Sequence, residues 1–578
     1  MNSDPNTTST TMDTFSPHIE GDGSSIIQFV GKWSYLIYHH RELLQMYLHL
    51  ILAAVFPIYI GSHASLKRPP SAALPKKKIG PDGKEEKGEK EIKIEGLTPS
   101  DAVLFPIVAG ITLGGLYWLI KWLEDPKLLN KILNIYFSTL GIFGVGKLVT
   151  DYMNVTMSFW FPSAWSDGKE TYYIEPLLRE QVTGSVNRSR VQTHRHFVDK
   201  TNPLPGFVSS VKFPGPVNKL LWSTRALAKE HWVFKGYLHG VGSIKSKVFF
   251  NDVLGLVIGV AAIAAYNLNG KKPPARSSIK PISKLKYHAG KEWWLTNLMG
   301  FAFCYGTLQL MSPTTFWTGT LVLIGLFIYD IVMVFYTPLM VTVATTLEVP
   351  IKLVFPGPKR GSMLGLGDIV LPGIIMALAL RFDLYLHYLR KQRIDTKPAI
   401  PSQEPGRLTN VRAEYVEATG RWGERFWTRR ANKGDVTEAD GARFPKVYFR
   451  ASLVGYVLAM LVTLVVMNIF NHAQPALLYL VPGVLTALWG TALVRGELRL
   501  MWEYNEDGEW GLEETHGVLG EQKKSDGWKA KSGEDEDKKD VKATIVREGE
   551  EGNEYKNHVF LFSLEMPSTQ GFDAKKEN

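Results

Sequence analysis

The chain has 578 residues, 45% of them apolar, a single cysteine and a formal net charge of +10 at pH 7. A mean hydropathy of −0.05 resembles that of a soluble protein, but it averages apolar runs of about 20 residues, the length that spans a bilayer, with highly charged stretches. Because Cys304 stands alone, an intrachain disulfide framework and a cysteine-based metal site are excluded. The positive charge lies in connecting loops, so we attribute it to membrane orientation rather than to nucleic-acid binding.

The N-terminal segment, 1–43, begins with polar residues and has neither a basic start nor an apolar core, so we do not expect a cleavable signal peptide. Asn6-Thr7-Thr8 is a candidate glycosylation site, usable only if this end is lumenal.

Nine apolar segments follow, and they predict an all-α, polytopic membrane protein with nine transmembrane helices. The third segment is the weakest, and internal repeats typical of many transporters are not found. The expected spans are 44–60, 102–120, 132–149, 248–268, 293–311, 315–340, 363–380, 447–470 and 475–494.

The loops between the spans predict the orientation. Lys and Arg together number 9 in 62–101, 13 in 163–247 and 13 in 389–446, and all three loops face the cytosol if the N-terminus is lumenal. Residues 269–291 carry 7 and depart from this rule, which long loops obey poorly. The predicted organisation is helices 1–5 within 44–311 with cytosolic loops 61–101 and 150–247, helices 6–7 within 312–383, a cytosolic insertion at 384–446, helices 8–9 within 447–496 and a cytosolic tail at 497–578.

The tail is highly charged and is expected to be disordered. It ends in Lys575-Lys576-Glu577-Asn578, which has the form of a Lys-Lys-x-x signal that returns membrane proteins to the endoplasmic reticulum. Such a signal requires a cytosolic C-terminus, as the loop charges independently predict.

Asp330 lies inside the sixth apolar span and Asp368 inside the seventh. Intramembrane carboxylates are costly and indicate function. In the predicted topology, Asp330 lies about 15 Å and Asp368 about 8 Å from the lumenal ends of their spans, at about 1.5 Å per residue. The short loop 341–362 keeps the two helices adjacent and antiparallel, so we expect the two carboxylates to face each other.

Two such carboxyls share one proton near neutral pH. The ionised member can take a proton from water while the protonated member polarises a peptide carbonyl, which is general acid–base hydrolysis without a covalent intermediate. The pair titrates as a unit, and we expect neither a metal nor another cofactor.

The neighbouring residues suit this chemistry. Gly365 and Gly367 let a helix or an extended substrate approach Asp368, and Tyr329 offers a wall beside Asp330. Pro372 and Gly373 weaken the helix and can permit local opening, although glycine and proline are common in membrane helices generally.

The ninth span opens with Gln474, Pro475, Ala476 and Leu477, at the lumenal end where both carboxylates lie. Proline at a helix start can be ordinary capping. Ala476 is small enough for close packing against the pair.

Three motifs, FIYD at Tyr329-Asp330, MLGLGDIVLPG around Gly365–Asp368 and HAQPALLYLVP from His472 to Pro482, resemble the signatures of the GxGD intramembrane aspartyl proteases. The chain is more similar to signal peptide peptidases than to presenilins, and the similarity extends over VTVATTLEVPIKLVFP, LTPSDAVLFPI and the Lys-Lys-x-x terminus.

The resemblance implies that Asp330 and Asp368 form the catalytic dyad and that Pro475, Ala476 and Leu477 shape the active site and the substrate path. It also implies a lumenal N-terminus, residence in the endoplasmic reticulum membrane, and type II-oriented substrates such as remnant signal peptides or tail-anchored proteins. Homo-oligomers or quality-control partners in that membrane are further expectations. The insertions 150–247, 269–291 and 381–446 depart from the family pattern.

The connector 343–355 is rich in β-branched residues, and we expect a short strand there that pairs with unwound substrate. Two other readings compete. One is an ion- or proton-coupled transporter or channel that uses the same Asp pair, with Asp252 as the main additional polar group. The other is an escort protein that binds transmembrane segments without cutting them.

Overall fold

The computed structural model describes residues 38, 41–73, 95–123, 127–176, 179–183, 196–198, 200–229, 231–238, 242–269, 293–347, 349–355, 362–396, 408–420, 422–430, 443–470, 474–506 and 560–565. The chain divides into two units, Met1–Leu50 and Ile51–Asn578. The packing relationships given below are those within the second unit.

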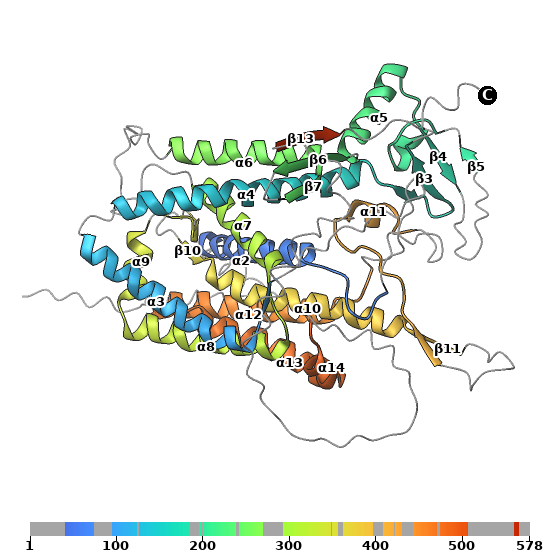
Figure 1. Ribbon diagram of the computed structural model, residues 1–578. Coiled ribbons are helices and arrows are strands. Elements are labelled where there is room, and N and C mark those ends of the chain that lie inside the picture. The colour runs from blue at the N-terminus through green and yellow to red at the C-terminus, as the bar shows by residue number, and fades with distance from the viewer. Residues whose placement is uncertain are drawn as a thin grey trace, which may run out of the picture. The chain divides into compact units, whose positions relative to one another are not determined.

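Each predicted span falls on a helix of the described residues (Figure 1). Eight of these helical segments are long and apolar enough to cross a membrane. The helices are α2 (Arg41–Ala64), α3 (Pro99–Leu123), α4 (Lys127–Trp160), α6 (Phe250–Asn269), α7 (Trp293–Leu310), α8 (Phe316–Ile331), α10 (Gly367–Lys391), α12 (Val447–Phe470) and α13 (Leu477–Arg495).

The predicted span that is not among these eight is the fifth, 293–311. It corresponds to α7, which has 18 residues and includes the polar Asn297 and Gln309. It packs against α4 and α10, and Met299 and Leu308 are buried. A helix surrounded by protein needs fewer strongly apolar residues than one that faces lipid, which explains its lower hydropathy.

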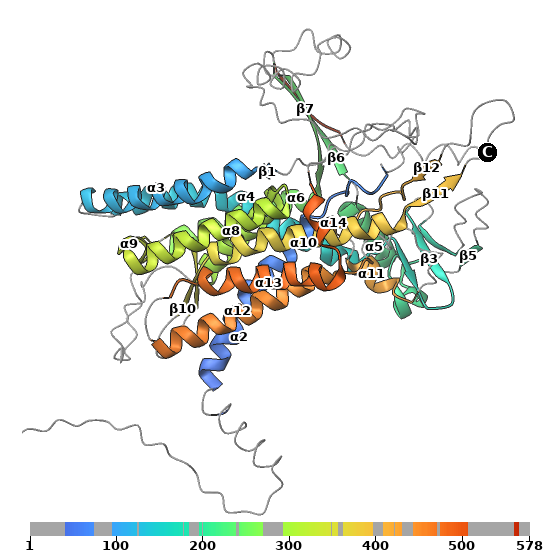
Figure 2. The same ribbon diagram turned by 90° about the horizontal axis from the view of Figure 1, so that it is seen from below.

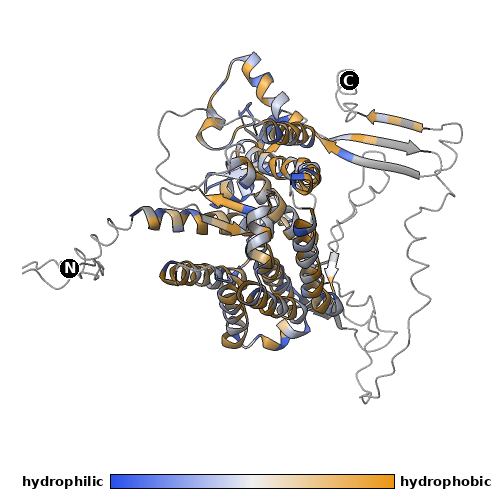
Figure 3. Cartoon of the chain, turned by 90° about the vertical axis from the view of Figure 1, so that its left-hand side faces the viewer, coloured by the Kyte–Doolittle hydropathy of each residue, from blue (hydrophilic) through white to orange (hydrophobic). Residues whose placement is uncertain are grey.

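Hydrophobic residues run along the helices (Figure 3), and on several helices large apolar side chains are exposed. On α3, Ile111 is 70% exposed and Trp122 is 68% exposed. Such a surface would promote aggregation in water but suits hydrocarbon, where a helix satisfies its own backbone hydrogen bonds.

The central helix of the second unit is α10. Every residue from Pro372 to Leu384 is buried, and α10 contacts α7, α8, α12 and α13. Figures 1 and 2 show α8, α12 and α13 running alongside it. An apolar run of this kind is expected to be buried on all sides.

The predicted sixth span is interrupted. After α8 comes a π-helical turn, η2 (Val332–Tyr336), and then a separate short helix, α9 (Leu339–Thr346). Thr337 between them is extended, with φ −133° and ψ 145°. The cause is Pro338, which lacks an N–H and disfavours helical geometry in the residue before it.

The predicted seventh span begins later than expected. Residues before it form an antiparallel hairpin of β9 (Lys352–Phe355) and β10 (Ser362–Gly365), in which Leu353 pairs with Leu364. The expected strand in 343–355 is therefore correct for β9 and wrong for 343–346, which belong to α9.

The chain after α4 forms a small lobe. With 34 residues, α4 is about 51 Å long at 1.5 Å per residue, well beyond the roughly 30 Å hydrocarbon core. An antiparallel sheet follows in the order β2-β3-β4-β5, with Tyr173 opposite Val182. Its elements are β2 (Ala164–Ser166), β3 (Thr171–Glu175), β4 (Glu180–Thr183), β5 (His196–Val198), the 3₁₀ helix η1 (Gly206–Ser210) and α5 (Gly215–Lys229).

The remaining elements are short. A parallel pair joins β1 to β8, β11 and β12 form an antiparallel pair, and β13 joins the hairpin of β6 and β7. Their bounds are β1 (Glu95–Leu97), β6 (His231–Leu238), β7 (Gly242–Phe249), β8 (Met311–Pro313), β11 (Arg393–Thr396), β12 (Leu408–Val411), α11 (Trp422–Trp427), α14 (Leu498–Glu503) and β13 (Phe560–Glu565).

The expectation that 497–578 is disordered is wrong for two segments. Residues of α14 and those just after it pack into the second unit, with Met501, Tyr504 and Glu506 buried. Strand β13 pairs with β6 along its length. An aromatic cluster around Tyr504 and an ion pair of Glu506 hold the first segment, and charge-based reasoning from the sequence does not reveal either.

Candidate active site

Asp330 lies in the last turn of α8 and is only 4% exposed. Its Oδ2 accepts a hydrogen bond of 3.0 Å from the backbone N–H of Leu477, the first residue of α13. Ala476, at the N-cap, provides no side-chain cap. The Asp330 carboxylate therefore caps α13 from another helix, where unpaired N–H groups and the helix dipole favour negative charge.

Asp368 is the second residue of α10 and is partly exposed. Its carboxyl lies within electrostatic range of the Asp330 carboxyl. The two acidic residues singled out in the sequence are thus brought together, from the end of one helix and the beginning of another.

The two glycines of the Gly-Leu-Gly-Asp motif have different surroundings. A Cβ at Gly365 would lie 3.2 Å from Asp368 Oδ2, whereas a Cβ at Gly367 would lie 3.9 Å from Leu371 Cδ1, an ordinary contact. The absence of a side chain at Gly365 therefore leaves room for the Asp368 carboxylate. Gly367 is exposed, which leaves room beside Asp368 for another molecule.

The other predicted residues lie around this pair. Tyr329 is within electrostatic range of Asp330, and its ring faces Gly110 of α3. Gln474 is partly exposed and Pro475 is buried. The helix begins at Leu477 rather than at Pro475, so Pro475 shapes the turn before α13 instead of occupying its first position.

Sequence reasoning missed a residue that touches the Asp368 backbone. Tyr456, on α12, is fully buried, and its hydroxyl donates a hydrogen bond of 3.2 Å to the carbonyl oxygen of Asp368. The sequence does contain a signal, since Pro372 follows Asp368 by four residues and cannot donate to that carbonyl. Only the structure shows which group replaces the missing donor.

A buried carboxylate further along α10 was also missed. Asp383 on α10 accepts hydrogen bonds of 3.0–3.2 Å from the backbone N–H groups of Val447, Tyr448 and Phe449, the first residues of α12. It is a structural cap. Asp252, the main polar exception noted in the sequence, accepts from the N–H of Phe249 at the start of its own helix, α6.

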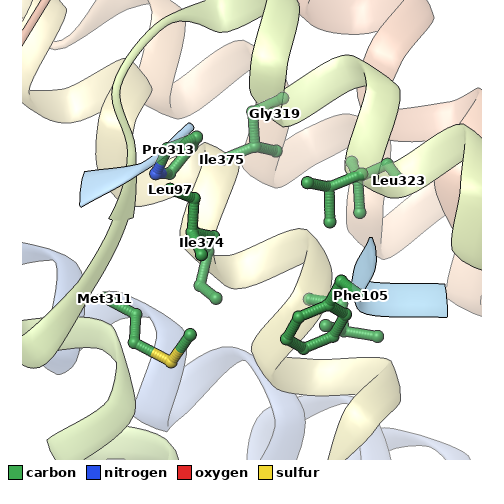
Figure 4. A pocket seen from close by; sticks show the side chains of 10 residues that line it. Leu97, Phe105, Met311, Pro313, Gly319, Leu323, Ile374 and Ile375 are labelled. Carbon is green, nitrogen blue, oxygen red and sulfur yellow. The ribbon is translucent and has the colours of Figure 1, made fainter. Parts of the chain in front are cut away.

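The structure also contains an apolar cavity, and neither Asp330 nor Asp368 lines it (Figure 4). It is formed between α3, α8 and α10 and the strands β1 and β8. Leu371, one turn after Asp368, contributes to its wall. The lining residues are Leu97, Phe105, Met311, Pro313, Gly319, Val322, Leu323, Leu371, Ile374 and Ile375.

Three predicted residues, Asn6, Lys575 and Lys576, lie outside the described residues. Within the part of the chain that the structure describes, no group of three or more His, Cys, Asp or Glu side chains is placed to hold a metal ion.

Two carboxyls within electrostatic range at the ends of neighbouring apolar helices suit an aspartic protease that acts inside the membrane. The sequence pattern of the family described as signal peptide peptidase matches residues 89–508. Signal peptide peptidase of Mus musculus is 27% identical over 471 residues, covering 79% of this chain and 82% of the mouse protein. The Homo sapiens protein of that name is 28% identical over 423 residues, covering 71% of this chain and 74% of its own length.

A probable intramembrane protease of Schizosaccharomyces pombe is 33% identical over 243 residues, which are 42% of this chain and 65% of the yeast protein. The chain belongs to the signal peptide peptidase family. It is a multi-pass membrane protein and an intramembrane aspartic protease that acts on membrane-embedded substrates, so the transporter reading is not supported.

Proposed function

We propose that Asp330 and Asp368 are the catalytic pair of this protease. The supporting observation is that the two carboxyls lie within electrostatic range of each other, since neighbouring carboxyls cannot both ionise cheaply and therefore share one proton. The hydrogen bond from Leu477 stabilises the anionic form of Asp330. We therefore assign Asp330 as the base and Asp368 as the protonated acid.

The proposed reaction begins when the Asp330 carboxylate takes a proton from a water molecule. The water oxygen attacks the peptide carbonyl carbon, and the Asp368 proton passes to the carbonyl oxygen, which gives a neutral tetrahedral diol. Collapse of the diol breaks the C–N bond. The protonated Asp330 gives its proton to the amine leaving group and the ionised Asp368 takes a proton from a diol hydroxyl, which restores the singly protonated pair. No covalent bond to the enzyme forms.

We further propose that the hairpin of β9 and β10 binds the unwound substrate. Asn297 pairs with both backbone groups of Val354, at 2.8 and 2.9 Å, and so covers the outer edge of β9. Val354 faces Met363 in the register, so this is a non-hydrogen-bonded pair, and the backbone groups of Met363 point to the opposite edge, that of β10. A substrate strand added there would reach Gly365, next to the pair.

The proposed substrates are remnant signal peptides and other type II-oriented segments, including tail-anchored proteins, in the endoplasmic reticulum membrane. This proposal is supported by the name of the mammalian relatives, by the basic loops that predict a lumenal N-terminus, and by the Lys575-Lys576 terminus. Asn6 offers a test of orientation. Loss of a glycosidase-sensitive mobility shift in Asn6→Gln would support a lumenal N-terminus, and cytosolic accessibility of a tag at this end would contradict it.

Reconstitution tests the catalytic assignment. Purified protein in liposomes with a signal-peptide-derived transmembrane substrate should yield two fragments with the unmodified chain and none with Asp330→Ala or Asp368→Ala. Normal cleavage by either variant would exclude the pair. Flux of ions without fragments would instead favour transport.

The strand proposal has a separate test. Deletion of 349–355 should abolish cleavage, and Met363→Pro should weaken it by removing one donor from the β10 edge, while both keep binding of a small dyad-directed inhibitor. Met363→Ala is the matched control for the side chain. Turnover by the deletion or by Met363→Pro equal to that of the unmodified chain would contradict it.

A further inference from the structure

Asp368 carries a defect in its own helix. In an α-helix the carbonyl of each residue accepts a hydrogen bond from the N–H four residues later. That residue is Pro372, inside α10, which has no N–H and whose ring crowds the same carbonyl. The Asp368 carbonyl is therefore deprived of its regular partner at the residue that bears the reactive carboxyl, and a carbonyl without a hydrogen-bond partner in apolar surroundings is costly.

The Tyr456 hydroxyl occupies the place of that missing donor. It comes from α12, is fully buried, and donates to Asp368 O over 3.2 Å. The hydroxyl also lies within electrostatic range of the Asp368 carboxyl. A single side chain thus contacts the backbone of Asp368 and lies near its carboxyl.

The helix that carries Tyr456 is itself fixed to α10. Asp383 of α10 accepts from the first three N–H groups of α12. These two ties, at Asp383 and at Asp368, lie 15 residues apart on α10 and run in the opposite order on α12, so the two helices are antiparallel. Tyr456 is thus held at a fixed position relative to the first turn of α10.

We propose that Tyr456 is a positioning residue of the protease: its hydroxyl replaces the N–H that Pro372 cannot supply and so fixes the backbone of Asp368, and with it the approach of the two carboxyls. The proposal rests on Asp368 being catalytic. Because the hydroxyl donates to the enzyme backbone, Tyr456 acts through Asp368 rather than on the substrate.

The test is a cycle of Tyr456→Phe, Pro372→Ala and the double variant, made in the full chain and assayed in liposomes with a transmembrane peptide. Tyr456→Phe should lower kcat about tenfold and leave KM unchanged. Pro372→Ala restores an N–H to the Asp368 carbonyl, so Tyr456→Phe should cost at most about twofold in the Pro372→Ala background. An equal loss in both backgrounds, or no loss in either, would overturn the proposal.

A second readout does not need turnover. The same four proteins are compared by thermal unfolding midpoint in detergent, where Tyr456→Phe should lower the midpoint more in the chain that keeps Pro372 than in the Pro372→Ala background. Additive shifts would contradict the proposal even if Pro372→Ala is inactive. Tyr448→Phe is the matched control, because this α12 hydroxyl donates to Glu497 over 2.7 Å and should show no coupling to Pro372. Loss of activity in Asp368→Ala tests the catalytic assignment separately.

Discussion

Arg381 and Glu506 form a buried ion pair, with 2.8 Å between Arg381 Nε and Glu506 Oε1 and both side chains 3% exposed. Lys67 lies 3.0 Å from the same oxygen, and Ser312 donates to the other one. Arg381 belongs to α10 and Glu506 follows α14, so the pair ties the C-terminal segment to the central helix. Burial by itself would raise the pKa of Glu506, but Arg381 and Lys67 more than offset it and lower the pKa below its usual 4.5.

Glu506→Ala should therefore destabilise the protein by about 3–5 kcal/mol, because it leaves the Arg381 charge buried and without its carboxylate partner. The measurement is the thermal unfolding midpoint of purified protein in detergent. The double variant Arg381→Met with Glu506→Leu removes both charges and should lie closer to the unmodified chain. Equal stability of Glu506→Ala and the unmodified chain would show that the pair does not contribute.

The same pair predicts a pH dependence. The pKa of Glu506 is lower in the folded than in the unfolded chain, so its stabilising contribution is complete above the unfolded value of 4.5 and is lost as the pH falls through the folded value. Unfolding midpoints of the unmodified chain and of Glu506→Gln should differ by a constant amount at neutral pH. The two curves should converge below pH 4.5, and a gap that persists at lower pH would contradict the assignment.

Asp383 gives a third prediction, on helix capping. Asp383→Ala leaves three N–H groups of α12 without their acceptor and should cost about 3 kcal/mol or more in stability. Asp383→Asn keeps one acceptor oxygen and should lie between Asp383→Ala and the unmodified chain. The protein that does fold should still cleave substrate, whereas a fully folded but inactive Asp383→Ala would point to a catalytic role.

The membrane-spanning helices could be predicted from the sequence because each is a long apolar run. In lipid, such a run must form a helix to satisfy its backbone hydrogen bonds. The sequence was also sufficient to single out Asp330 and Asp368, because a carboxyl in such a run stands out against its surroundings. Asp383 and Arg381 lie in the same helix as Asp368 but beyond the predicted seventh span, 363–380, so this reasoning did not single them out. Asp383 binds residues of α12 and Arg381 binds Glu506, which follows α14. These partners are far away in the sequence, and hydrophobic periodicity does not predict such long-range contacts.

Helix boundaries near the pair were less predictable. Gly365 and Met363 were expected inside the seventh span but belong to β10. Their pairing with β9, together with the hydrogen bond between Asn297 and Val354, overrides the local preference for helix. Similarly, the break at Thr337-Pro338 is readable from proline chemistry, while the π-helical turn before it is not. The contact of Leu477 with Asp330 depends on the placement of α13 and required the structure.

Gly365 yields a prediction about the carboxylate itself. In Gly365→Ala the new Cβ would lie 3.2 Å from Asp368 Oδ2, tight enough to displace that oxygen, so kcat should fall about tenfold. Gly367→Ala is the matched control within the motif, because its Cβ makes only an ordinary contact with Leu371. The comparison uses kcat on a transmembrane peptide together with unfolding midpoints. A larger loss of kcat in Gly367→Ala would mean that substrate, rather than Asp368, fills this space.

The last prediction concerns the close contact of α12 with α13, which carry Tyr456 and Leu477 toward the pair. A Cβ at Gly455 would lie 2.5 Å from the carbonyl oxygen of Gly483 and 2.7 Å from the Ala487 Cβ, so the helices must move apart in Gly455→Ala. Overpacking of this kind costs about 1–3 kcal/mol. Gly490→Ala, also on α13, meets no atom within 4 Å and should keep or slightly raise stability.

Because the displaced helices hold both Tyr456 and the N–H of Leu477, Gly455→Ala should also lower kcat, and Gly490→Ala should not. Both variants are measured for unfolding midpoint and for turnover at saturating substrate. If Gly455→Ala loses stability but keeps full kcat, the α12–α13 spacing is needed for folding alone, and the carboxyl pair tolerates movement of the helices that contact it.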